Sequence, residues 1–458
     1  MAVTVEQIAE WVPKIIESAA RVLAEKGMFA VSEELLTAVS GQPGVTVAGQ
    51  RVCFEESVTV GFLERYHAAR PFTPPARLTV SSGAHANHIV DLGGALRPIT
   101  QADLEWAARL GGALGDCGLT AYAPGIHQNV PAPLQGLGQL LAGAKNKPGA
   151  AIHAVHYPAA QPFIRECQTI LGQGHGAGIH VVSPLRFEGQ EVDEALALRR
   201  ENPAASIGVG SMPIVGVSTP ATALAGAVTA LAEVVGGALL MVKSGTPPER
   251  LGMSVNLYPF DMRHGCFVYG TPSNLLLTRI ERELNRYLGT EISAKTFSVM
   301  AQRPGAKSCA LKGLATGLMA AEGRMIFSAA GSLSLDEVYS PVQLLYDREI
   351  LAYVQRSREM MTDSLDEALL LVDEIIADTT GSFLGADSTL DHFRTLQWDS
   401  GIFPTRMLQQ WCEAGEPDEH DLAVEEIGRL LAGYEFELEA DKTRALDEVY
   451  ARARAALL

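Results

Sequence analysis

The central part of the chain alternates between two patterns of hydrophobic and polar positions. Short apolar runs, typical of buried strands, are separated by longer segments in which apolar residues recur every three or four positions, as on one face of a helix. The predicted strands lie at residues 119–123, 151–156, 178–182, 206–210, 252–257, 292–299 and 324–329. The predicted helices lie at residues 101–114, 134–144, 193–200, 221–242, 274–287 and 305–321. Repeated strand–helix units of this extent predict a parallel sheet, either closed as a barrel or open and doubly wound.

The number of predicted strands helps to decide between a closed barrel and an open sheet. Seven strands are one fewer than a (β/α)8 barrel requires, and the missing strand is predicted at either 77–82 or 382–384. Several strands run directly into loops rich in polar and aromatic residues, and TIM-type barrels carry their chemistry at the carboxyl ends of the strands. We therefore expect a TIM-type (β/α)8 barrel.

Helical segments flank the expected barrel on both sides. Residues 1–75 are expected to form an N-terminal helical appendage, with helices at 5–25, 32–40 and 58–69 and a strand pair around 45–54. The barrel domain is expected over residues 76–410. A C-terminal helical element over residues 411–458, with helices at 419–433 and 440–457, is expected to pack on the barrel or to form oligomer contacts.

Composition and charge exclude several kinds of partner. The net charge of −17 and the pI near 5.1 argue against nucleic acid, which binds through clustered Lys and Arg. Six cysteines lie far apart without a CxxC pair, so we expect reduced thiols, no metal site and a cytoplasmic location. Residues 221–242 are apolar enough to cross a bilayer, but Glu233 and the flanking prolines predict a buried helix, and hence no membrane partner.

No common nucleophile, zinc-protease or P-loop motif is present, and the Gly208-Val-Gly210 pair is too weak to predict a dinucleotide site. The richest stretch follows the strand predicted at 252–257. There, Tyr258 and Phe260 could form an aromatic cage for a quaternary ammonium, or could simply close the top of the core. Asp261 and Arg263 could contact a substrate or pair within the loop.

Two lysines raise a different class of enzyme. Lys243 and Lys295 follow or lie within predicted elements, and Lys295 stands in an apolar run where burial would lower its pKa. A lysine Schiff-base aldolase is therefore an alternative, which borohydride trapping with carbonyl substrates would distinguish.

Four segments, in the same order, resemble the trimethylamine:corrinoid methyltransferase family over roughly residues 75–410. They are Ser183-Pro-Leu-Arg-Phe187; Met212-Pro-Ile-Val-Gly-Val-Ser-Thr-Pro-Ala-Thr-Ala-Leu-Ala-Gly-Ala227; Asp261-Met-Arg-His-Gly265 with Gly270-Thr-Pro-Ser273; and Phe383-Leu-Gly-Ala-Asp-Ser-Thr-Leu-Asp-His-Phe-Arg394. The resemblance implies a TIM-type barrel that moves a methyl group from a methylated amine to the cobalt of a corrinoid carried by a separate small protein.

Two departures from the family pattern narrow that expectation. Some members carry pyrrolysine near a stretch that matches residues 292–300, where this chain has ordinary residues. The chain therefore resembles the non-pyrrolysine branch, which includes enzymes acting on quaternary amines such as glycine betaine. Ser382 stands where many members have a histidine, so the methyl donor is expected to be betaine-like without being fixed as betaine.

The resemblance also suggests roles for individual residues. Tyr157, Tyr258 and Phe260 are expected to contact the cation, and His156 and Arg263 the anionic end of a zwitterion. Asp261, Asn87 and Ser298 complete the candidate substrate-binding set.

A quaternary ammonium shapes what the chain must do. It already carries its charge and leaves as a neutral amine, so it needs no general acid and offers no lone pair to a metal. The chain would position the methyl group and exclude water. We expect no tightly bound cofactor, a corrinoid presented by a cognate corrinoid protein, and a homo-oligomer. A non-catalytic binding or sensing relative is the remaining alternative.

Overall fold

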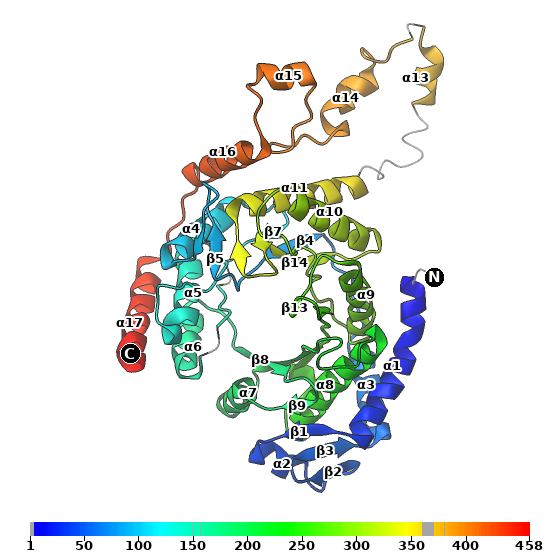
Figure 1. Cartoon of the computed structure of the whole chain (residues 1–458), viewed down its shortest axis with the longest axis vertical. Helices are drawn as coiled ribbons and strands as arrows, with labels where there is room; N and C mark the ends of the chain where they lie inside the picture. The colour runs from blue at the N-terminus through cyan, green and yellow to red at the C-terminus, as the bar shows by residue number, and fades with distance from the viewer. Residues whose placement is uncertain (1–3, 150, 156, 360–370, 380) are drawn as a thin grey trace.

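The computed structural model describes residues 4–149, 151–155, 157–359, 371–379 and 381–458. Strands lie inside a ring of helices (Figure 1). The N-terminal appendage lies on the outside of this ring. It contains α1 (Val5–Glu25), β1 (Met28–Ala30), α2 (Glu33–Val39), β2 (Val45–Ala48), β3 (Arg51–Phe54) and α3 (Glu56–Ala69). The bounds of α1 are those predicted, because the Thr4 side chain caps the helix at Gln7.

Two three-stranded parallel sheets form the centre of the molecule. The first has the order β11 (Leu251–Ser254), β10 (Ser206–Ser211), β8 (Gly176–Val181). The second has the order β14 (Ile326–Ala330), β4 (Thr79–Ser82), β7 (Leu119–Thr120). The expected mixed α/β architecture with parallel sheets is confirmed. The additional strand predicted at 77–82 is β4, and residues 382–384 form no strand, so that alternative is wrong.

Eight helices surround these sheets and include all six of those predicted. They are α4 (Gln101–Ala113), α5 (Ala132–Asn146), α6 (Gln161–Ile170), α7 (Gln190–Glu201), α8 (Ala223–Lys243), α9 (Pro272–Tyr287), α10 (Ala306–Ala321) and α11 (Pro341–Glu359). The helices α6 and α11 were not predicted. Short strands in the connections are β5 (His88–Val90), β6 (Leu96–Pro98), β9 (Arg186–Phe187), β12 (Phe260–Asp261), β13 (Cys266–Phe267), β15 (Ser332–Leu333) and β16 (Val338–Tyr339).

Two predicted strands take a different form. The described residues 151–155 form no strand, and the backbone N–H of Ala154 donates to the side-chain oxygen of Gln139 in α5, at 2.6 Å, instead of to a neighbouring strand. Of residues 292–299, Ala294 alone forms a bridge, to Phe327 in β14. Strand pairing is therefore interrupted, over the described residues, between β7 and β8 and between β11 and β14.

Helix α8 is the core helix of the first sheet. It is long and apolar enough to cross a membrane, but 78% of its most apolar 18-residue segment is buried inside the molecule. Two glycines let neighbours approach closely: a Cβ at Gly236 would lie 2.5 Å from Met28, and one at Gly237 would lie 2.7 Å from Phe187. The prediction of a buried helix is confirmed.

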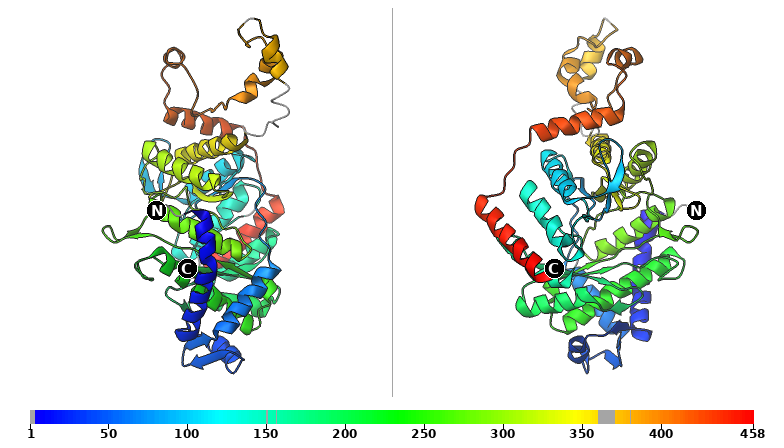
Figure 2. Two further views of the ribbon diagram at one scale, coloured as in Figure 1. Left: turned by 90° about the vertical axis from the view of Figure 1, so that its right-hand side faces the viewer. Right: turned by 60° about the vertical axis from the view of Figure 1, so that its left-hand side comes forward.

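The C-terminal region has two parts. The helices α13 (Val372–Ala377), α14 (Asp387–Leu396) and α15 (Leu408–Glu413) form an arm that projects from the ring in all three views (Figures 1 and 2). The chain then returns to the ring. Helix α16 (Glu419–Ala432) packs against α4 and α11, and α17 (Ala440–Leu457) packs against α5 and α6. The last two helices therefore pack on helices of the ring.

Candidate active site at the strand ends

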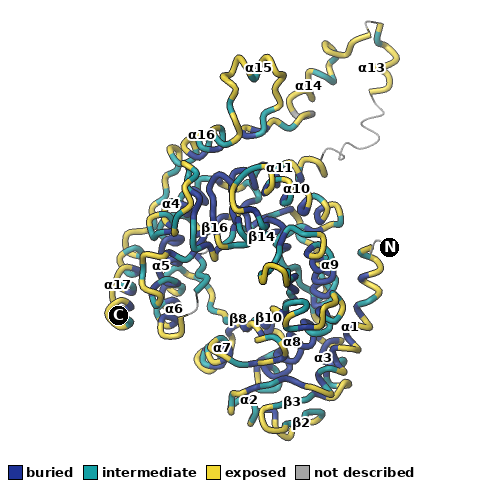
Figure 3. Tube along the Cα trace, in the orientation of Figure 1, coloured by how far each residue is buried: buried dark blue, intermediate teal, exposed yellow. Residues whose placement is uncertain are grey.

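The first parallel sheet has one buried face and one face of very small residues. Ile179, Val209 and Met253 are at most 3% exposed and belong to the apolar core that includes α8. Because side chains alternate along a strand, the residues between them point the other way, away from this core. The sheet lies between α8 and the centre of the ring (Figures 1 and 3), so that other face is the inner one. This inner face consists, in register, of Gly178, Gly208 and Gly252, followed by His180, Gly210 and Ser254.

The second sheet repeats this division. Val80, Leu119 and Phe327 are at most 3% exposed and lie in a second apolar core. The paired residues Ser81, Thr120 and Ser328 point the other way and are half-buried or exposed. TIM-type barrels usually fill their interior with bulky branched side chains. The inner faces of these two sheets instead carry mainly glycine and small hydroxyl residues, and a Cβ added at Gly178 would meet no atom within 4 Å.

An aromatic cluster stands beyond the carboxyl end of β11. The Tyr258 ring lies edge-on to Phe267, with centroids 5.6 Å apart, and edge-on to Tyr269, with centroids 6.3 Å apart. Phe260 lies edge-on to Phe267 at 6.2 Å. Phe260 and Phe267 face each other across the hairpin formed by β12 and β13. The stretch rich in rings therefore forms one cluster at a strand end, as the sequence suggested.

Lys295, which follows the residue that bridges to β14, also contacts this cluster. Its ammonium donates a 2.7 Å hydrogen bond to the Tyr258 hydroxyl and lies 4.6 Å from the centre of the Tyr258 ring. Lys243 lies instead at the last position of α8, on the outside of the ring, where its ammonium is 3.4 Å from the side-chain oxygen of Gln42. Of the two lysines considered for a Schiff base, Lys295 alone stands at the candidate site.

Helix α9 holds the segment between β11 and Tyr258 in place. The Asn285 side chain accepts from the Val255 N–H at 2.9 Å and donates to the Val255 carbonyl at 2.8 Å. The Glu281 carboxylate accepts the Leu257 N–H. Burial raises the pKa of Glu281 to about 7, although the Leu257 hydrogen bond and the charges of Arg324 and Lys295 oppose the shift. Two side chains of one helix thus replace a strand partner and direct Tyr258 toward Lys295.

A small polar cavity of about 10 Å³, with room for no more than a water molecule, lies at the centre of this group. Its lining includes Asn256, Tyr258, Tyr269, Asn274, Thr278, Glu281, Ser293 and Lys295. Burial raises the pKa of Tyr269, so its hydroxyl stays protonated. The cavity offers several hydrogen-bond donors beside a lysine, a carboxyl group with a raised pKa and aromatic rings. Titratable groups with shifted pKa values at strand ends are characteristic of functional sites.

A second buried carboxyl group organises the loop after β8. Glu233 of α8 is fully buried and accepts from the Ser183 hydroxyl at 2.9 Å and from the Leu185 N–H at 3.0 Å. Leu185 has φ +58°, a conformation that is unusual for leucine and that this hydrogen bond supports. Burial raises the pKa of Glu233 to about 7. At the end of β8, His180 lies with its Nδ1 3.2 Å from the Glu191 carboxylate.

The remaining predicted site residues lie in several places. Asp261 pairs with Arg263 at 2.9 Å and with His264 at 3.0 Å within the hairpin turn, and these hydrogen bonds lower the pKa of Asp261. The Arg263 side chain is 85% exposed. Tyr157 is 39% exposed at the start of a 3-10 turn before α6.

Asn87 and Ser298 lie beside another loop. The Asn87 N–H donates to the Glu337 carbonyl, and the Ser298 hydroxyl donates to the Leu335 carbonyl, so both residues contact the segment between β15 and β16. His156 lies outside the described residues. The substrate roles of all eight predicted residues stay predictions. Glu281, Tyr269 and His180 were missed by sequence reasoning, although Glu281 is a charged residue on the apolar side of an amphipathic helix, which is a signal for burial.

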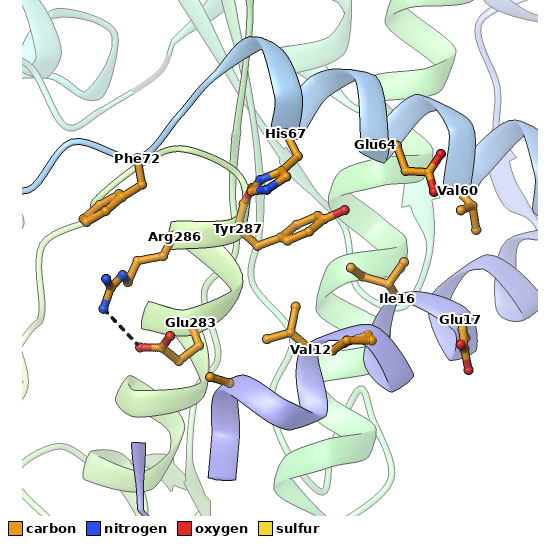
Figure 4. Close-up of a pocket in the computed structure, with 12 residues that line it drawn as sticks. Val12, Ile16, Glu17, Val60, Glu64, His67, Phe72, Glu283, Arg286 and Tyr287 are labelled. Carbon is orange, nitrogen blue, oxygen red and sulfur yellow. Dashed lines mark hydrogen bonds and ion pairs between the residues drawn. The ribbon is translucent and has the colours of Figure 1, made fainter. Parts of the chain in front are cut away.

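A larger pocket lies elsewhere, on the outer side of the ring (Figure 4). It has a volume of about 740 Å³ and lies between α1, α3 and α9. His67 stacks on Tyr287 with ring centroids 4.4 Å apart, and Arg286 lies near Glu283 at 3.7 Å. The ring nitrogen Nδ1 of His67 is already bonded to the Tyr287 carbonyl at 2.7 Å. We place the candidate active site at the strand ends, because proteins with parallel sheets carry their chemistry at the carboxyl ends of the strands.

Comparison with known proteins identifies the family. The model of the trimethylamine methyltransferase (MTTB) family matches residues 175–457. The chain belongs to the trimethylamine methyltransferase family. The matched range includes β8, β10, β11 and the site residues His180, Tyr258, Glu281 and Lys295. The resemblance seen in the sequence is therefore confirmed at the level of the family.

Individual relatives are distant from this trimethylamine methyltransferase family member. Trimethylamine methyltransferase MttB of Methanosarcina thermophila is 25% identical over 239 residues, which is 51% of this chain and 48% of that protein. The chain thus matches about half the length of this relative. The crystal structure of the hydroxylamine MtmB complex covers 95% of this chain and 89% of its own, at 12% identity and a TM-score of 0.41. That likeness is too distant to define the fold or the activity.

Proposed function

We propose that this family member transfers a methyl group from a quaternary, betaine-like amine to the Co(I) corrinoid of a separate corrinoid protein. The observation that carries the proposal is the open inner face of small residues leading to an aromatic and lysine-containing cluster at the strand ends. The corrinoid is a co-substrate in this scheme, and its reduced cobalt supplies the nucleophile. The proposal also includes a cytoplasmic location, a homo-oligomer and no tightly bound cofactor.

A closed (β/α)8 barrel is part of the same proposal. In the first sheet β8, β10 and β11 lie in chain order, and in the second sheet the last strand, β14, lies beside the first, β4, which is followed by β7. The Ala294 bridge extends the second sheet beyond β14. The described residues 151–155 fall between β7 and β8 in the chain, where a barrel would place its third strand. The two parallel sheets would then be two arcs of one barrel, with their inner faces opposed across its centre.

The chemistry assigned to the chain is positioning. A quaternary nitrogen has no lone pair, so the enzyme neither protonates it nor coordinates it to a metal, and the methyl group must be aligned with the attacking cobalt. The small residues of the inner face leave room for the reacting groups. The aromatic hairpin excludes water and attracts the cationic end of the donor.

A donor comparison tests this function. The chain, a Co(I) corrinoid acceptor and one amine are combined without oxygen, and the loss of Co(I) absorbance is followed together with the demethylated amine. Glycine betaine or a related betaine is expected to react, and trimethylamine is expected to react much more slowly. Robust reaction of trimethylamine with inert betaines would reverse the assignment, and reaction of neither amine would favour a non-catalytic relative.

A further inference from the structure

The side chain of Lys295 points toward the inside of the ring. The preceding residue, Ala294, forms two hydrogen bonds with β14: its N–H donates to the Ile326 carbonyl, and its carbonyl accepts the Ser328 N–H, each at 2.9 Å. The Ala294 side chain is 1% exposed and lies in the second apolar core. Because neighbouring residues of an extended segment point to opposite sides, Lys295 faces the inner side, where Tyr258 meets it.

Lys295 and Tyr258 together offer hydrogen-bond donors on the inner side of the ring, beside a cavity of about 10 Å³ that admits no more than a water molecule. Over the described part of the chain, the Tyr258 hydroxyl is the hydrogen-bond partner of the Lys295 ammonium. An ammonium has three N–H donors, so this bond leaves two of them. The Tyr258 oxygen accepts from Lys295, which leaves its own O–H to donate. An ammonium and a phenol O–H side by side match the oxygens of a carboxylate.

The acidic group beside this pair does not fully neutralise the positive charge of Lys295. Glu281 is the acidic group of the cavity, and its carboxylate already accepts the Leu257 N–H. Its raised pKa, about 7, leaves it partly protonated near neutral pH. The other polar lining residues, Asn256, Asn274, Thr278 and Ser293, are uncharged. Among the described residues that line the cavity, Lys295 carries the positive charge, and its ammonium favours an anionic group.

We propose that Lys295 and Tyr258 bind the carboxylate of a zwitterionic methyl donor and so select carboxylates over alcohols. This assignment rests on the proposed function and deepens it by naming the group that fixes the donor's anionic end. Arg263, which the sequence suggested for that role, is 85% exposed and already paired with Asp261.

The same geometry separates the two ends of the donor. Like charges repel strongly when water is partly excluded. The Lys295 ammonium lies 4.6 Å from the centre of the Tyr258 ring, so a second cation at that ring would be repelled. The trimethylammonium end is therefore placed away from Lys295, and Tyr258 contacts the carboxylate instead of the cation.

The test uses four ligands of one shape that differ in two groups. Glycine betaine and choline carry the trimethylammonium, and 3,3-dimethylbutyrate and 3,3-dimethylbutan-1-ol carry a neutral tert-butyl group in its place. Betaine and the butyrate have a carboxylate, whereas choline and the butanol have a hydroxyl. Their affinities are measured by calorimetry for the wild type, Lys295→Met, Tyr258→Phe and the matched control Lys243→Met. Melting temperatures and the conservative variant Lys295→Arg show whether each protein is folded and whether charge alone restores binding.

The wild type is expected to bind each carboxylate more tightly than the matching alcohol. Lys295→Met should weaken both carboxylates by about tenfold or more and leave both alcohols unchanged. Tyr258→Phe should act in the same direction with a smaller loss, Lys243→Met should change nothing, and Lys295→Arg should recover most of the carboxylate preference. Lys295-dependent binding of the butyrate without binding of betaine would support the carboxylate site and contradict the quaternary-amine function. Unchanged carboxylate binding in Lys295→Met, an equal loss for all four ligands, or no carboxylate preference in the wild type would overturn the inference.

Discussion

Two carboxyl groups that are buried among apolar residues organise the loops of the candidate site, and burial decides their protonation. Glu233 holds the Ser183–Leu185 turn, and Glu281 holds the segment that leads to Tyr258. Both pKa values are raised to about 7, since the charged form loses its hydration. The fold therefore favours the protonated carboxyl in both places, at a pH where free glutamate is ionised.

The pH dependence of stability should reveal Glu233. A carboxyl pKa raised on folding contributes stability that is fully present below the unfolded value, near 4.5, and is lost as pH rises through about 7. That difference corresponds to up to about 3 kcal/mol at high pH. Denaturant unfolding at pH 5, 6.5 and 8 should show wild-type stability falling with pH and a shallower fall in Glu233→Gln. Equal slopes in the two proteins would show that Glu233 is not the group concerned.

For helices and strands, the bounds that depend on nearby residues in the sequence were predicted better than the pairing that depends on tertiary contacts. The bounds of α1 and α17 were predicted to the residue, and α4 and α16 within one residue. Their apolar periodicity and, in α4, the Thr100 cap are encoded within a few positions.

Strand prediction from the local sequence was wrong where side chains distant in the sequence bond the backbone groups that a neighbouring strand would otherwise bond. The Ala154 N–H bonds Gln139, so an apolar run at 151–155 forms no strand. The side chains of Glu281 and Asn285 similarly accept hydrogen bonds from backbone N–H groups after β11. The rings of the site could be found from their density in one stretch. Their meeting with Lys295 and Glu281 could not, because it depends on how α9 and β14 pack.

If reactants use the inner face of the first sheet, a large side chain placed on that face should block methyl transfer. A Cβ at Gly178 would have no neighbour within 4 Å, so Gly178→Leu should fold, with a change in unfolding free energy below about 1 kcal/mol. The new side chain would occupy the open inner face and should lower methyl transfer at least tenfold. As a contrast, Gly237→Ala on the buried side meets Phe187 and should destabilise the protein. Full activity of a stable Gly178→Leu protein would show that reactants do not use this face.

At the scale of the whole molecule, the projecting arm exposes large apolar side chains. Ile376 is 74% exposed, Leu384 84% and Met407 75%, on α13 and the loops on either side of α14. Apolar surface of this kind on a projecting element is typical of a protein–protein contact. This surface supports the proposed homo-oligomer, since α16 and α17 are already packed on their own ring.

Light scattering after size exclusion tests the assembly. The wild type should have a mass that is a multiple of the 48.8 kDa chain. The double change Ile376→Asp and Leu384→Asp should lower that mass while leaving the melting temperature of the ring almost unchanged, because both side chains are exposed. Leu314→Asp, which alters an exposed apolar side chain on α10, away from the arm, is the matched control and should keep the wild-type mass. A wild type that is monomeric at micromolar concentration would contradict the proposed oligomer.

The most direct test of the account follows the methyl group itself. Glycine betaine labelled with 13C in its N-methyl groups is incubated with the chain and a Co(I) corrinoid acceptor, and the products are read by NMR. If the chain transfers the methyl group, a labelled methyl–cobalt resonance and an equal amount of dimethylglycine should appear, both absent without the chain and both strongly reduced in Gly178→Leu and Lys295→Met. Consumption of betaine without label on cobalt, or label on cobalt at the same rate in these folded variants, would contradict it.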